Sequence, residues 1–182
     1  MFHHRCSILT YDTNRRPGLD VEPAWTTNAA GLTFHNVYGF GAIDARAAVT
    51  AAQTYVADSL GTFKEGTIRS NSTDITVPDL TGATSVINEP ELGTAEFVRV
   101  EIFANHSFPS DWTIALTSPS GTRSVLLPAF NAYQTWPSNG FELGSNAFYG
   151  EPQQGNWTLE LFDHLNPDAG TLTSWSIRIY GH

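Results

Sequence analysis

Two stretches of this sequence indicate its fold most clearly: Gly155-Asn-Trp-Thr-Leu-Glu-Leu-Phe-Asp163 and Gly170-Thr-Leu-Thr-Ser-Trp-Ser-Ile-Arg-Ile-Tyr-Gly181. In both stretches every second residue is large and apolar over much of the length, which is the pattern of a β-strand with one buried face. The residues between them, Asn166-Pro-Asp-Ala-Gly170, are of types that favour turns. We therefore expect the two stretches to pair as antiparallel strands that close a small all-β domain.

Short apolar or alternating runs recur through the chain from about residue 66 onward, and clusters such as Pro137-Ser-Asn-Gly140 separate them. The predicted strands are, in chain order, 67–77, 85–88, 95–104, 112–118, 124–128, 147–149, 156–162 and 172–180. About eight strands at this spacing are typical of a jelly-roll-like β-sandwich. The apolar residues expected between its two sheets are Val98, Val100, Ile102, Ile114, Leu116, Trp157, Trp175 and Ile177.

Residues 1–60 form an extension with a different pattern. Asn14-Arg-Arg-Pro-Gly18 and Asn28-Ala-Ala-Gly31 are predicted turns. A helix predicted over about 44–56 follows them, with Asp44 as its N-cap or first-turn acid. One face of this helix carries a stripe of apolar residues, namely Ala45, Ala48, Val49, Ala52, Tyr55 and Val56. The first 60 residues offer no obvious partner for this stripe. We therefore expect one domain at 61–182 and, at 1–60, a piece of something larger. That piece is expected to be partly disordered, or to pack on the β domain or on another copy of the chain.

The composition narrows the classes of function. The 182 residues are 41% hydrophobic and 12% aromatic, enough for one domain with a real core. A formal net charge of -9 argues against nucleic-acid binding, since such proteins usually carry a basic stripe. An acidic surface suits an extracellular protein that binds Ca²⁺, but it also suits solubility alone.

The sequence indicates neither a membrane segment nor a disulfide. No apolar run of 18 residues is present, and the single cysteine, Cys6, excludes an intrachain disulfide. Residues 1–7 lack the apolar core of a signal peptide, so a tag remnant or a truncated start is expected there. His3 and His4 beside Cys6 either bind a metal weakly or have this same origin.

Two parts of the chain resemble the same family, the kexin- and furin-like subtilisin-type serine proteases. Residues 66–181 resemble its P domain, also called the Homo B domain. The segments that carry this resemblance are 106–116, Thr117-Ser-Pro-Ser-Gly-Thr-Arg-Ser-Val-Leu-Leu127, Tyr149-Gly-Glu151 through Gly155-Asn-Trp157, and Gly170-Thr-Leu-Thr-Ser-Trp175. The segments Trp25-Thr-Thr-Asn-Ala-Ala-Gly31 and 34–45 resemble the C-terminal tail of the family's catalytic domain, and the two matches occur in the family's order.

This resemblance implies a non-catalytic domain of a secreted serine endopeptidase, with that enzyme's catalytic domain as its partner. A subtilisin-like enzyme needs Asp, His and Ser in that order, with the Ser on a turn of small residues. That nucleophile turn is not found, because Gly121-Thr122 is followed by Arg123. The resemblance places residues 1–57 after the nucleophile, so we expect no peptidase activity from this chain alone. The role implied is to stabilise and regulate the catalytic domain.

Carboxylates at strand ends and turns suggest calcium as a possible cofactor. Asp111, Glu151, Asp163 and Asp168 occupy such positions, and carboxylates that converge at one end of a sandwich would suit Ca²⁺. The three predicted ligands are Asp111, Glu151 and Asp163. No EF-hand spacing supports the prediction, and the alternative is that Asp111 and Asp163 cap turns through their own backbone.

The aromatic residues between Tyr133 and Tyr149 indicate either a docking face or part of the core. Phe141 and Phe148 fit the core better, whereas Tyr149 and Trp136 are the predicted interface residues. A second function from a different class is a free jelly-roll module that binds carbohydrate or another extracellular target through exposed aromatics. The extension at 25–56 separates the two functions, because a carbohydrate module has no need of a protease-derived helix.

Overall fold

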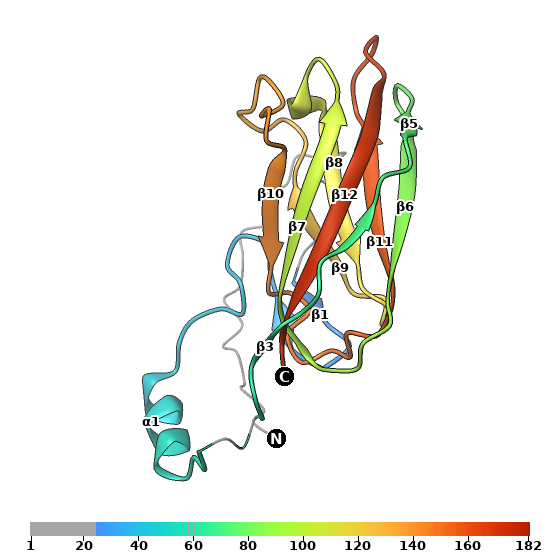
Figure 1. Cartoon of the computed structure of the whole chain (residues 1–182). Coiled ribbons are helices and arrows are strands. Elements are labelled where there is room, and N and C mark those ends of the chain that lie inside the picture. Colours follow the sequence, from blue (N-terminus) through green and yellow to red (C-terminus); the bar gives the residue numbers. More distant parts are fainter. Residues whose placement is uncertain (1–24, 58, 60) are drawn as a thin grey trace.

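The described residues, 25–57, 59 and 61–182 of a computed structural model, form an antiparallel β-sandwich with a helical extension (Figure 1). The predicted fold class is therefore confirmed. His3, His4 and Cys6, for which weak metal binding and a tag origin were the two alternatives, lie outside the described residues, as does the turn predicted at 14–18.

The extension comes first in the chain, and the sandwich strands follow it. The extension holds β1 (Thr26–Thr27), β2 (Thr33–Phe34) and the helix α1 (Ala45–Gln53). The early strands of the sandwich are β3 (Lys64–Glu65), β4 (Arg69–Asn71), β5 (Ile75–Val77), β6 (Gly82–Glu89) and β7 (Ala95–Asn105). After a short 3-10 helix at Pro109–Asp111 follow β8 (Trp112–Thr117), β9 (Arg123–Leu127), β10 (Phe141–Ser145), β11 (Gly155–Asp163) and β12 (Gly170–Gly181).

Two sheets make up the sandwich, and every pairing within them is antiparallel. One sheet has the order β10-β7-β12-β3, and β4 and β5 pair with other parts of the same edge of β12. The second sheet has the order β6-β11-β8-β9. A separate two-stranded sheet joins β1 to β2 in the extension.

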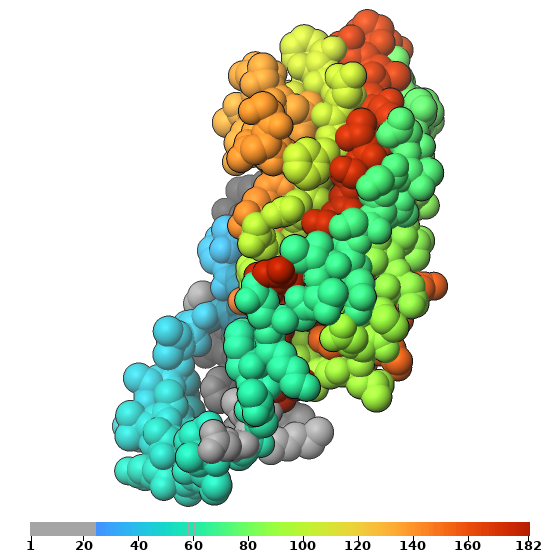
Figure 2. Space-filling view, in the orientation of Figure 1, coloured from blue at the N-terminus to red at the C-terminus, as the bar shows by residue number. Residues whose placement is uncertain are grey.

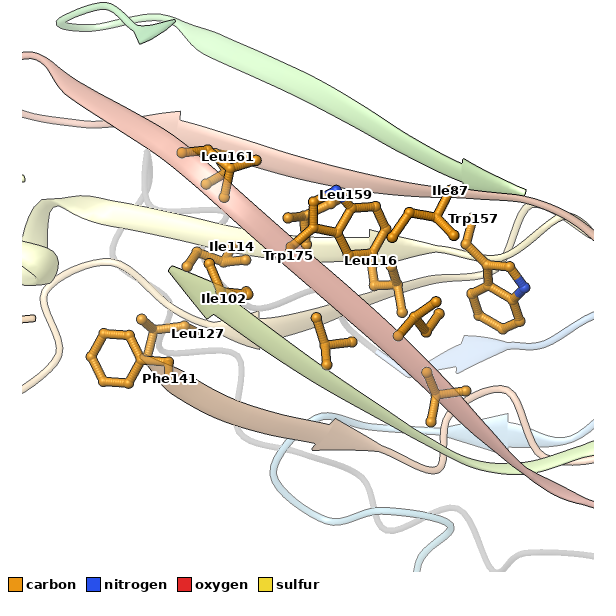
Figure 3. Packing of buried hydrophobic residues seen from close by; sticks show 14 of the residues in the cluster. Ile87, Ile102, Ile114, Leu116, Leu127, Phe141, Trp157, Leu159, Leu161 and Trp175 are labelled. Carbon is orange, nitrogen blue, oxygen red and sulfur yellow. The ribbon is translucent and has the colours of Figure 1, made fainter. Parts of the chain in front are cut away.

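The core lies between the two sheets, and every residue predicted for it is at most 1% exposed. Trp157, Leu159 and Leu161 project inward from β11, and Trp175 projects from β12 on the opposite sheet (Figure 3). Burying such large side chains is the main force that stabilises a domain of this size. Phe141 and Phe148 are also buried, as expected.

The prediction that the stretches 155–163 and 170–181 pair with each other is wrong. β11 lies in the four-stranded sheet between β6 and β8, whereas β12 lies in the other sheet beside β7. The connection at 164–169 therefore crosses from one sheet to the other, and the two strands face each other across the core. Alternation shows which face of a strand is buried, but it carries no information on which strand lies beside it.

Two predicted strands also differ from the structure. Residues 147–149 form turns, and the strand in that region is β10, which pairs with β7. Gly144 within β10 packs its backbone against the ring of Phe97, and a glycine inside a strand weakens its sequence pattern. The run at 67–77 is divided into β4 and β5.

The helix α1 starts where the sequence predicts, because the Asp44 carboxylate accepts a hydrogen bond of 2.9 Å from the Ala47 backbone N–H. None of its nine residues is buried. In the space-filling view, the segment that contains α1 projects from one end of the sandwich (Figure 2). Its apolar stripe thus has no cover from the described sandwich.

Candidate functional site at the junction of the extension and the sandwich

The tip of the β1–β2 hairpin docks on one end of the sandwich, and we call the contact region the junction. The tip, residues 28–31, is a tight turn in which the Gly31 N–H donates to the Asn28 carbonyl at 2.9 Å. Gly31 has a φ of +80°, a conformation that glycine adopts without the strain of a Cβ. The turn predicted at this place from the sequence is therefore present.

Asn28 is the residue through which the turn contacts the sandwich. Its side-chain amide donates to the carbonyl oxygens of Ala147 and Tyr149, both at 2.9 Å. Its side-chain oxygen accepts from the N–H groups of Ala30 and Leu32, at 3.1 and 2.9 Å. Asn28 is 3% exposed. One buried side chain thus holds its own turn together and also bonds the backbone of the sandwich.

Glu151 makes the reciprocal contact from the sandwich. Its carboxylate accepts from the Ala29 N–H at 2.9 Å, from the Ser118 hydroxyl at 2.6 Å and from the Thr122 hydroxyl. The Thr122 oxygen also accepts from the Ala29 N–H, at 3.1 Å. Ser118 and Thr122 flank the turn between β8 and β9, so this carboxylate connects three separate parts of the chain.

The Glu151 side chain is fully buried and, within the described part of the chain, forms no ion pair. Its donors are two hydroxyls and one backbone N–H. A buried carboxylate is costly unless hydrogen bonds replace its water, so each of these donors matters to the stability of the site.

Tyr149, a predicted interface residue, lies at the junction. It is 38% exposed, and its ring packs edge-on against Phe40 of the extension, with ring centroids 6.2 Å apart. Partial burial raises the pKa of the Tyr149 hydroxyl, and the negative charge of Glu96 adds to this. Next to it, Gly150 has a φ of +83°, and a Cβ there would meet the Cβ of Ala30 at 3.0 Å, so the extension sits directly on this turn.

Trp136, the other predicted interface residue, is at the opposite end of β10 from Tyr149. Its half-buried ring packs edge-on against Phe141 and Trp112, at centroid distances of 4.7 and 5.6 Å. Phe141 begins β10, whereas Tyr149 follows its end. The structure therefore places Trp136 against the sandwich core and does not bring it together with Tyr149.

The three carboxylates predicted to bind calcium are not brought together either. Glu151 precedes β11 and Asp163 ends it, so the length of a nine-residue strand, about 26 Å at 3.3 Å per residue, separates the two ends. Among the described residues, no group of three or more acidic, His or Cys side chains could hold a metal. Asp111, at the end away from Glu151, accepts from the Ser110 hydroxyl at 3.1 Å. These ligands do not fit a shared calcium ion.

Asp163 belongs to a buried hydrogen-bonded cluster at the end away from the junction. Its carboxylate accepts from the Trp112 indole N–H at 3.2 Å and from the Leu165 N–H at 3.1 Å. The His106 Nε2 lies 3.0 Å from this carboxylate and 2.6 Å from the Asp168 carbonyl oxygen. Both neighbours are acceptors, so the imidazole carries a proton on Nε2. The Leu165 contact is the turn cap that the sequence offered as the alternative to a metal ligand.

The contacts of the junction residues could not be predicted from the sequence. Asn28 was assigned only to a turn, and Glu151 was assigned to a metal site. Ser118 and Thr122 stood inside a motif of the P-domain resemblance. The residues of this network are up to 122 positions apart, and no local pattern in a single sequence marks such pairs.

Several known proteins are similar to this chain in sequence and fold. The model of the proprotein convertase P-domain family matches residues 95–179. An extracellular serine protease of Aeromonas sobria is 30% identical over 98% of this chain and 35% of its own length. Proprotein convertase subtilisin/kexin type 5 of Rattus norvegicus is 33% identical over 86% of this chain and 9% of its own length.

A crystal structure agrees with the sequence comparisons. The serine protease of Aeromonas sobria superposes with a TM-score of 0.80 and 28% identity, over 89% of this chain and 34% of that one. The chain thus spans about a third of the Aeromonas protease that it matches. The superposed part, 89% of this chain, is longer than the sandwich at residues 61–182, so the match also includes part of the extension.

The two antiparallel sheets and the family-model match define a class, the P domains that accompany subtilisin-like proteases. Over residues 95–179 the β-sandwich of this chain matches the proprotein convertase P-domain family. Within the described residues, no helix is long and apolar enough to cross a membrane.

Proposed function

We propose that the chain is the P domain, together with the adjoining end of the catalytic domain, of a secreted subtilisin-like serine endopeptidase. Residues 1–60 would belong to the catalytic domain and residues 61–182 to the P domain. The role of the chain is to stabilise and regulate the catalytic domain. The proteases to which it is similar support this proposal, as does the word "extracellular" in the name of the Aeromonas relative.

The single observation that carries the proposal is the exposed apolar stripe on and around α1. Val49 in α1 is 60% exposed, and Ile43 just before the helix is 90% exposed. Tyr55 and Val56, directly after the helix, are exposed as well. Soluble domains rarely leave such a contiguous stripe open, and a patch of this kind marks a protein–protein contact. A catalytic domain is the partner that fits, because the Aeromonas relative is a serine protease about three times as long as this chain.

Stabilisation follows from mass action. A domain that binds only the native form of its neighbour shifts the folding equilibrium of that neighbour toward the native state. Covalent connection raises the effective concentration of the two domains to about millimolar, so even a weak contact would be largely formed. The catalytic domain therefore gains stability without any change at its active site.

The proposal is tested in the full-length protease that carries this chain, by replacing Val49 with Asp. A charge in the apolar contact should lower the midpoint of heat inactivation by at least about 2 °C. Thr50→Asp is the matched control, because it adds the same charge one position along the same helix but off the stripe. Equal midpoints for the two variants and the parent would contradict the proposal.

The alternative function, a free module for carbohydrate or another extracellular target, is not better supported. Of the five Trp residues, Trp112, Trp157 and Trp175 are buried in the core. Trp136 packs half-buried on that core. A Trp platform on an open sheet face, which such a module would use, is not seen among the described residues.

A further inference from the structure

Three buried polar side chains of the junction bond the backbone of the opposite segment, namely Asn28 from the extension and Thr122 and Glu151 from the sandwich. Asn28 of the extension donates to the carbonyls of Ala147 and Tyr149 in the sandwich. Glu151 of the sandwich accepts from the N–H of Ala29 in the extension. Because each contact uses a side chain from one partner and the backbone from the other, it fixes the relative position of both segments.

We propose that Asn28 and Glu151 form a latch by which the P domain recognises the turn at 28–31 and thereby positions the segment that leads to the catalytic domain. The inference rests on the proposed function for the identity of that segment. It adds that the P domain holds the end of the catalytic domain by a specific polar contact, whereas the apolar stripe on α1 would pack against the rest of the catalytic domain. Asn28 and Glu151 are in this sense positioning residues.

Because Glu151 bonds both the turn and the sandwich, docking of the turn and order in the sandwich depend on each other. When the turn leaves, the carboxylate loses the Ala29 N–H and keeps only the hydroxyls of Ser118 and Thr122. The carbonyls of Ala147 and Tyr149 lose their donor at the same time. Leaving buried acceptors without donors is costly, so the undocked state is disfavoured from both sides.

The geometry also makes the contact selective for the residue at position 28. The side chain must donate through one end and accept through the other, while it remains 3% exposed. An amide does both. An aspartate of the same shape would keep the acceptor but place a second oxygen against two carbonyl oxygens, and alanine would supply neither group.

The latch is tested in the isolated 182-residue chain by hydrogen exchange, with the amides of β7 and β12 as the internal reference. Asn28→Asp and Asn28→Ala should speed exchange at Ala29 and Leu32 by roughly tenfold to a hundredfold, while the sandwich amides stay protected. Thr27→Ala is the matched control, because Thr27 is an exposed residue of the same hairpin and only bonds Thr33 across it. It should leave Ala29 and Leu32 protected.

Glu151→Ala tests the other half of the latch and, because Glu151 is buried, can also loosen the sandwich. The double variant Asn28→Ala/Glu151→Ala resolves this. If the two residues act as one latch, the second substitution adds little to exchange at Ala29 once the first has released the turn. Independent structural roles would instead give additive effects, and that result would overturn the proposal.

Unchanged exchange at Ala29 and Leu32 in both Asn28 variants would also overturn it. The outcome is separable from that of the proposed function, since the latch is measured in this chain alone and the Val49→Asp test in the full-length protease. If the Asn28 variants exchange like the parent but Val49→Asp lowers the midpoint of heat inactivation, the proposed function stands and the latch does not.

Discussion

Among single residues, the two fully buried carboxylates, Glu151 and Asp163, accept hydrogen bonds inside the fold. Glu151 and Asp163 are both fully buried, and each is surrounded by N–H or O–H donors from distant parts of the chain. The residue type alone does not separate this role from metal binding, because a hard oxygen ligand and a hydrogen-bond acceptor are the same atom. The neighbours that the fold supplies decide between the two roles.

We expect His164 to make the stability of the folded chain depend on pH. Burial lowers the pKa of its imidazole below the ordinary value of 6.5, and the negative charge of Asp163 opposes this only in part. The unfolded chain therefore binds this proton more readily than the folded chain does. The contribution of His164 is fully present above about pH 6.5 and is lost as the pH falls through its folded pKa.

We expect His164→Gln to make the melting temperature depend less on pH between about pH 7 and pH 5 than in the parent chain. Gln retains a partner for the Thr113 hydroxyl, which lies 2.8 Å from Nε2 of His164. The measurement is a series of thermal unfolding curves across this range. A slope as steep in the variant as in the parent would show that other groups dominate the acid loss of stability.

At the scale of elements, α1 differs from the strands in what holds it. Each long strand buries one face in the core, whereas α1 buries none of its residues. A helix of nine residues is also shorter than isolated helices that are stable in water. Its N-cap by Asp44 contributes only about 1 kcal/mol. The stability of α1 therefore depends on whatever covers its apolar stripe.

We predict that the amides of α1 exchange within seconds in the isolated chain, while those of β7 and β12 stay protected. Asp44→Ala should remove any remaining protection over 45–53, because the Ala47 N–H loses its acceptor. Hydrogen exchange at two protein concentrations measures this. Slow exchange that persists at low concentration would mean that the isolated chain already covers the helix, and protection only at high concentration would indicate a second copy.

At the scale of the whole molecule, calcium binding stays a prediction whose proposed ligands the structure does not assemble. If Asp163 and Glu151 serve only the hydrogen bonds described, thermal unfolding with excess Ca²⁺ and with excess EGTA should coincide. A native-state site held at a hundred times its Kd would add about 2.7 kcal/mol, which corresponds to a shift of several degrees. Such a shift would require a different set of ligands, for which Asp111→Asn would be the first variant to examine.

The class of the fold and much of its core could be predicted from the amino-acid sequence. The alternation in β11 and β12 identified Trp157, Trp175 and their neighbours as buried, because burial of one face is a property of the strand alone. The start of α1 at Asp44 was likewise predictable, since an N-cap uses only residues within one turn. The P-domain resemblance, carried by motifs in order along the chain, indicated the family.

Which elements and side chains contact one another became visible only in the folded chain. In the structure, β11 and β12 lie in opposite sheets. Glu151 and Asp163 lie at opposite ends of β11, and Trp136 and Tyr149 lie at opposite ends of β10. Asn28 also bonds the backbone at 147–149, and Ala29 bonds Glu151, across more than a hundred residues. The physical reason is that periodicity and turn chemistry act over a few residues, whereas these contacts depend on how the chain crosses between sheets.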